Sequence, residues 1–135
     1  MKSVMKKSLM SLALTLILLS ASQAEAASVK TRLMIPNVAG SVMVNNGAQQ
    51  AVSGPNASGQ VQQVLNLNRG HYAAPGELGT GENRVVFMTD YGQHTLYLQI
   101  SGQLNPREDL SLDLYRNHYV LSDSSGSAVA IGNVD

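Results

Sequence analysis

The 135-residue chain contains no cysteine. Disulfide bonds and thiolate metal sites are therefore excluded, although small exported domains often use disulfides to reinforce a small core. A domain formed by this chain must be stabilised by side-chain packing and backbone pairing, or by assembly with another chain. The absence of cysteine is equally compatible with the periplasm, the cell surface and the medium.

Clustered positive charge is missing from the chain after residue 26, where the cations are scattered and fewer than the acids. A nucleic-acid partner is not expected, because tracking a phosphate backbone requires grouped Lys and Arg side chains. This part of the sequence also lacks an apolar segment of the roughly 20 residues that a membrane-spanning helix needs. We therefore expect no membrane span in the mature chain.

Motifs that support catalysis are absent as well. After residue 26, no serine lies in a G-x-S-x-G or S-x-x-K motif, and the glycine-rich residues 79–82 lead into an expected strand, whereas a phosphate site needs a following helix. His71, His94 and His118 show no spacing typical of paired metal ligands. We predict a protein without enzymatic activity, cofactor or metal, and metal binding remains a minor alternative.

The first 26 residues have the pattern of a secretory signal. Lys2, Lys6 and Lys7 precede an apolar run at residues 9–19, and Ala24-Glu25-Ala26 supplies a small-residue cleavage site. A retained membrane anchor is the alternative, but the apolar run is too short to span a bilayer comfortably. We predict a signal peptide at residues 1–26 and a single mature domain at residues 27–135, exported to the periplasm or cell surface of a bacterium.

Alternating apolar residues dominate the second half of the chain. Leu96, Leu98 and Ile100 alternate with polar residues, and Leu110, Leu112 and Leu114 do the same. This period places one apolar face on an extended strand. Short strands separated by turn residues at spacings of about ten residues predict an all-β domain: a small antiparallel β-sandwich with meander or Greek-key connections, or a small barrel.

The first half is less regular. Asn45-Asn46-Gly47-Ala48 between two apolar runs predicts a hairpin, and residues 60–68 predict a further strand. Residues 69–82 contain several glycines and a proline, and we interpret them as a long connection without an element of its own. Such connections often carry function or are mobile.

The segment after the signal is a candidate assembly strand. Val29, Thr31, Leu33 and Ile35 fall on one side of it, and Pro36 ends it. A strand of this kind could pair with another subunit, as in strand donation, although we favour its membership of its own sheet. In general form the chain resembles subunits of chaperone–usher fimbriae, which are exported, all-β and poor in charge. Many such subunits carry a disulfide, which this chain lacks.

Four tyrosines form a candidate interaction surface: Tyr91, Tyr97, Tyr115 and Tyr119. Tyr97 and Tyr115 fall opposite the leucine faces, so a tyrosine patch would result if their strands paired. Exposed aromatic side chains bind carbohydrate or protein, whereas packing across the sheet is the structural alternative. We expect a surface or fimbria-type structural or adhesion subunit. A monomeric periplasmic ligand-binding or inhibitor module is the alternative, and an enzyme or metal protein is the weakest.

Overall fold

The computed structural model describes residues 27–135, and in this range all the regular elements are β-strands. The predicted signal peptide lies outside the described residues. The strands are β1 (Ala27–Leu33), β2 (Ala39–Val44), β3 (Gln50–Pro55), β4 (Val61–Tyr72), β5 (Glu77–Thr89), β6 (Gly92–Ile100), β7 (Leu110–Leu114), β8 (His118–Ser122) and β9 (Ala128–Asn133). The all-β prediction is confirmed.

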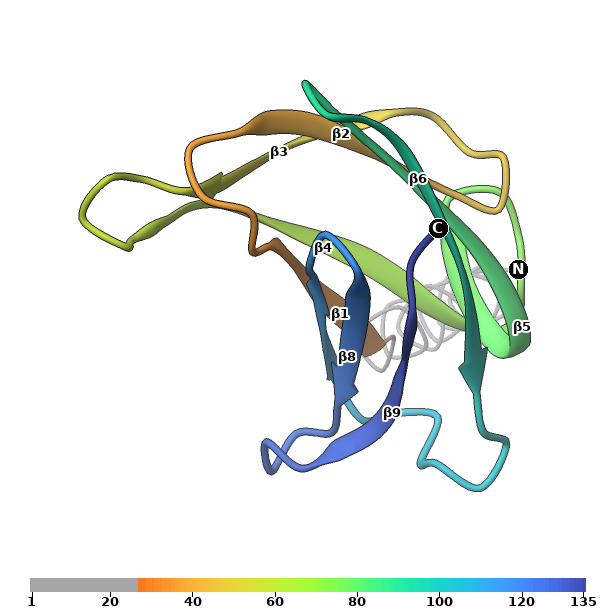
Figure 1. The fold of residues 1–135 in the computed structure, drawn as a ribbon. Coiled ribbons are helices and arrows are strands. Elements are labelled where there is room, and N and C mark those ends of the chain that lie inside the picture. The colour runs from red at the N-terminus through yellow and green to blue at the C-terminus, as the bar shows by residue number, and fades with distance from the viewer. Residues whose placement is uncertain (1–26) are drawn as a thin grey trace, which may run out of the picture.

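The strands follow one another in the order β6-β5-β2-β3-β4-β1-β7-β8-β9. Two layers result, with β2, β3 and β6 above and β1, β8 and β9 below in Figure 1. The long strands β4 and β5 connect the layers, because β4 pairs with both β3 and β1 and also runs beside β5. Most pairs are antiparallel, but β1 lies parallel to β7 and β4 lies parallel to β5.

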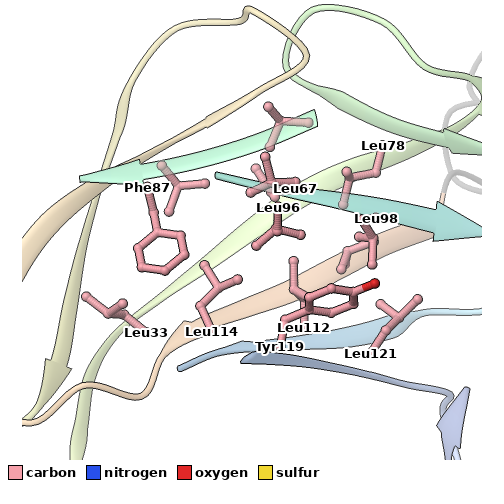
Figure 2. Close-up of a cluster of buried hydrophobic side chains, with 14 of the residues drawn as sticks. Leu33, Leu67, Leu78, Phe87, Leu96, Leu98, Leu112, Leu114, Tyr119 and Leu121 are labelled. Carbon is pink, nitrogen blue, oxygen red and sulfur yellow. The ribbon is translucent and has the colours of Figure 1, made fainter. Parts of the chain in front are cut away.

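Apolar side chains from both layers fill the space between them (Figure 2). Leu96, Leu98 and Ile100 of β6 meet Leu112 and its neighbours from β7, and all of them are buried. The alternation seen in the sequence thus gives each strand one core face. Burial of each such side chain contributes about 1.5–3 kcal/mol, so packing replaces the disulfide that this domain lacks.

The hairpin predicted at residues 45–48 is present. β2 and β3 pair antiparallel on either side of it, and Asn45 and Asn46 have φ angles of 49° and 63°. Asparagine tolerates this left-handed conformation better than most residues, which explains its use at the turn.

Residues 69–82 differ from the prediction, because they are mostly strand. β4 continues to Tyr72, and the chain then turns back through Gly76, at a φ of 80°, so that β5 starts beside β4 and runs parallel to it. At this crossing, a Cβ on Gly79 would lie 2.0 Å from the Tyr72 carbonyl carbon. The glycines permit two strands to cross closely. Their number had suggested a long irregular connection, and that prediction is wrong.

Buried Asn83 stabilises this crossing. Its side chain accepts a hydrogen bond from the Gly79 amide at 2.9 Å and donates to the Gly79 carbonyl at 2.8 Å. It also donates to the carbonyl oxygens of Gly81 and Leu98 and accepts from the Asn45 amide group. One side chain therefore satisfies backbone groups that the crossing leaves without ladder partners.

The two ends of the strand order approach each other at the C-terminus. The amide of Asp135, just after β9, donates to the Thr95 carbonyl of β6 at 3.0 Å, and the C-terminal end lies against β6 in Figure 1.

Candidate interaction sites

The candidate assembly strand is an interior strand of its sheet. β1 pairs antiparallel with β4, from Ala27↔Arg69 to Arg32↔Val64, and parallel with β7, from Val29↔Leu110 to Leu33↔Leu114. The predicted face of Val29, Thr31, Leu33 and Ile35 is buried against the core. β1 thus fills a position between two strands that have no ladder with each other.

The outward face of β1 is joined to β7 by an ion pair. Arg32 Nε and Nη2 donate to the two carboxylate oxygens of Asp113 at 2.8 and 2.9 Å. This hydrogen bonding raises the pKa of Arg32 above its ordinary value. The side chains are 36% and 16% exposed, so the pair is partly screened by water.

The beginning of β1 is attached to the β6–β7 loop. The Ser28 amide donates to Asp109 at 2.9 Å, and the buried Arg69 beside it donates to the carbonyl oxygens of Asn105 and Glu108 at 2.8 and 2.6 Å. Burial lowers the pKa of Arg69 from its ordinary value. The loop is therefore attached to the start of β1 through the Asp109 carboxylate and to β4 through backbone carbonyl oxygens.

The four candidate tyrosines do not form one surface. β6 pairs with β5, and β7 pairs with β1 and β8, so Tyr97 and Tyr115 do not lie on paired strands. Tyr91 and Tyr97 are 60% and 55% exposed, whereas Tyr119 is 7% exposed and lies in the core (Figure 2). Tyr119 is buried because the leucine face of β8 includes it, and Gly132 leaves room for its ring.

Tyr91 and Tyr115 each contact a residue of the segment 116–118, at the turn between β7 and β8. The Arg116 guanidinium carbon lies 4.0 Å from the centre of the Tyr91 ring. Tyr115 stacks on His118 with ring centres 4.4 Å apart and an angle of 5° between the ring planes. Two exposed planar groups of this turn are thus held by their faces.

A shallow, open cleft of about 310 Å³ lies beside these stacked pairs. We call it the turn cleft, and its lining residues are Met34, Ile35, Pro36, Tyr115, Arg116, Asn117 and His118. Its two walls are the β1–β2 linker (residues 34–38) and the β7–β8 turn. Of the predicted site residues, only Ile35 and Tyr115 belong to it. Arg116 and Asn117 were not predicted as site residues, because the two walls are some 80 residues apart in the sequence and meet through the parallel β1–β7 pair.

The other residues considered for chemistry are dispersed. His94 stacks on Phe87 at 4.9 Å, and His71 is exposed on β4. Within residues 27–135, no three His, Asp or Glu side chains converge as a metal site. No helix of this described part is long and apolar enough to cross a membrane.

Comparison with known proteins gives no relative. No family model matches the chain, and no curated protein and no solved structure matches it significantly. β1 and the turn cleft are the features of this chain that bear on its function.

Proposed function

We propose that this chain is an exported, non-catalytic β-domain that acts by assembly, as a structural or adhesion subunit at a bacterial cell surface. The observation that supports this proposal is the position of β1. It is the first strand after the predicted signal, yet it lies between β4 and β7 in the interior of its sheet. The β1 strand that fills the position between β4 and β7 can belong to the same chain or to a second copy.

Exchange of β1 between copies would preserve nearly all its contacts. The backbone ladders to β4 and β7, the buried Val29 and Leu33, and the Arg32–Asp113 ion pair would form equally between two chains. The free-energy difference between the unexchanged and the exchanged form then depends only on the conformation of the linker and on the protein concentration. Strand exchange of this kind builds closed dimers or open fibres, depending on geometry.

The β1–β2 linker is suited to act as the hinge. Asn37 has a φ of 59°, and its amide donates to the Pro55 carbonyl at 2.8 Å. Opening the linker would release this left-handed residue into an extended conformation, at the cost of that hydrogen bond.

The absence of cysteine in the chain allows a direct test by disulfide trapping. Lys30 and Asn66 are exposed and face each other across β1 and β4. We would prepare residues 27–135 as Lys30→Cys and Asn66→Cys single variants, unfold them in urea, refold them together at high concentration and oxidise. We expect a disulfide-linked heterodimer, because β1 of one chain then lies against β4 of the other.

Two controls decide the interpretation. A chain carrying both cysteines should form an intrachain disulfide when refolded dilute, which establishes that the paired positions have suitable geometry. Lys30→Cys refolded with Gln99→Cys, an exposed residue of β6, should give no specific product. An intrachain disulfide in the double variant, with no heterodimer at any concentration, would refute β1 exchange.

A monomeric ligand-binding module is the second candidate, and the turn cleft is the observation that favours it. A sharp thermal transition that is independent of protein concentration, raised by a ligand, would support this function and not assembly.

A further inference from the structure

We propose that the turn cleft is a saccharide-binding site that receives one or two pyranose rings. This inference extends the second candidate function, ligand binding, and its argument does not rest on β1 exchange. Three features of the cleft support it: an apolar wall, a polar rim without hydrogen-bond partners inside the protein, and a volume at the lower end of the range for small-ligand sites.

The apolar wall comes from the β1–β2 linker. Met34, Ile35 and Pro36 line one side, and the partly buried ring of Tyr115 lies on the other. A pyranose ring has C–H groups on its faces and hydroxyl groups around its edge. Aromatic and aliphatic surfaces suit those faces, since an amphipathic ring such as tyrosine combines an apolar body with a polar tip.

The polar rim consists of three consecutive side chains: Arg116, Asn117 and His118. Across residues 27–135, none of these three side chains makes a hydrogen bond to another described residue. Arg116 is held by its face over Tyr91, and His118 by its face on Tyr115, so the nitrogen-bearing edges of both groups remain available. Together they offer donors and an acceptor, which matches hydroxyl groups that both donate and accept.

The backbone of this turn is fixed although its side chains lack partners. The Tyr115 amide donates to the His118 carbonyl at 2.9 Å, and the Val134 amide donates to the Asn117 carbonyl at 3.0 Å. A ligand would therefore meet a preorganised turn and would lose little affinity to backbone ordering.

Charge restricts the class of ligand. Arg32, the nearest cation on β1, is neutralised by its two hydrogen bonds to Asp113, which leaves Arg116 as the permanent cation among the lining residues. A polyphosphate or sulfated polymer would require several cations. The cleft instead suits a neutral sugar, or a sugar acid whose single carboxylate meets Arg116.

The test is a titration of the ¹⁵N-labelled mature chain, residues 27–135, followed by amide chemical shifts. The probes are galactose, glucose, N-acetylglucosamine and chitobiose as neutral sugars, and glucuronic acid and N-acetylneuraminic acid as acidic ones. We expect at least one probe to shift the amides of residues 34–35 and 115–118 in a saturable manner. If the acidic sugars bind more tightly and Arg116→Gln abolishes this preference, then Arg116 binds the sugar carboxylate. If acidic and neutral sugars bind equally, then the cleft recognises the hydroxyl groups.

Matched variants locate the binding. Asn117→Ala is expected to weaken the affinity at least tenfold, because it removes polar groups that would bind the sugar hydroxyls. The fold should be unaffected, since the Asn117 side chain makes no hydrogen bond within the described residues. Tyr97→Ala removes an exposed tyrosine of β6 that does not line the cleft, and it should leave the affinity unchanged. The proposal would be overturned if no probe shifted these amides at millimolar concentrations, or if Asn117→Ala bound the probe as tightly as the parent does.

Discussion

Arg32 and Asp113 form a two-point hydrogen-bonded ion pair across β1 and β7, although 81 positions separate them in the sequence. The pair lies directly opposite in the parallel register of these strands. It therefore joins β1 to a strand that comes much later in the sequence, on the outer face of the sheet.

The ion pair gives a first prediction. We expect Asp113→Ala to lower the free energy of unfolding by about 1–2 kcal/mol, because it leaves Arg32 without its partner. The coupling in a double-mutant cycle of Asp113→Ala with Arg32→Ala should be about 1 kcal/mol, limited by the solvent around the arginine. Urea unfolding measures both quantities. A coupling of zero would show that the backbone ladders alone align β1 with β7.

The strand crossing at Gly79 gives a second prediction. A Cβ at this position would lie 2.0 Å from the Tyr72 carbonyl carbon and 2.1 Å from the Ala73 nitrogen, and both are backbone atoms that cannot rotate away. We expect Gly79→Ala to lower the free energy of unfolding by more than about 2 kcal/mol, through strain and displacement of the Asn83 hydrogen bonds.

Gly102→Ala is the matched control, because the nearest atom to its Cβ is the Thr80 methyl group at 3.5 Å. This substitution should change stability by less than about 0.5 kcal/mol. Equal urea midpoints for the two alanine variants would contradict the close crossing of β4 and β5.

These residues also show what the sequence could and could not predict. The leucines of β6 and β7 were assigned correctly because their period of two is a local property that each strand carries. Residues 69–82 were misinterpreted because glycine marks both loops and close strand crossings, and only the three-dimensional contact at Gly79 distinguishes them. The burial of Tyr119 could have been inferred from its alternation with Leu121, whereas the turn cleft could not, since its walls meet through a pairing of distant strands.

A third prediction concerns acid stability. In the β8–β9 turn, the Ser125 hydroxyl and the Ser125 and Ser127 amides donate to the Asp123 carboxylate, and these hydrogen bonds lower the pKa of Asp123 below its ordinary 3.8. A lowered pKa in the folded state means that the charged carboxylate stabilises the fold above pH 3.8 and that this contribution is lost as the pH falls through the lowered value.

The difference in urea midpoint between the parent and Asp123→Ala should therefore be largest near neutral pH and decrease below pH 3.8. Asp123→Asn keeps an acceptor oxygen without the charge, so its urea midpoint at neutral pH should lie between those of the parent and Asp123→Ala. A difference that stays constant across this range would mean that the hydrogen bonds of the turn do not depend on the ionised carboxylate.

The fourth prediction links the two proposals, because the turn cleft and the hinge share residues. Met34, Ile35 and Pro36 line the cleft in the unexchanged chain, and exchange of β1 would carry the linker toward the second copy. A sugar that binds the intact cleft therefore stabilises the unexchanged chain. At 100 times its dissociation constant this stabilisation is about 2.7 kcal/mol, or roughly 100-fold in the equilibrium constant per site. The yield of Lys30→Cys/Asn66→Cys heterodimer should fall accordingly when refolding includes the sugar identified by titration.

The same pair in an Asn117→Ala background should keep its yield, since the linker is unchanged and the sugar is bound weakly. An undiminished yield in the parent background, with the cleft saturated, would show that the linker residues keep their positions in the exchanged form and that binding and assembly are independent.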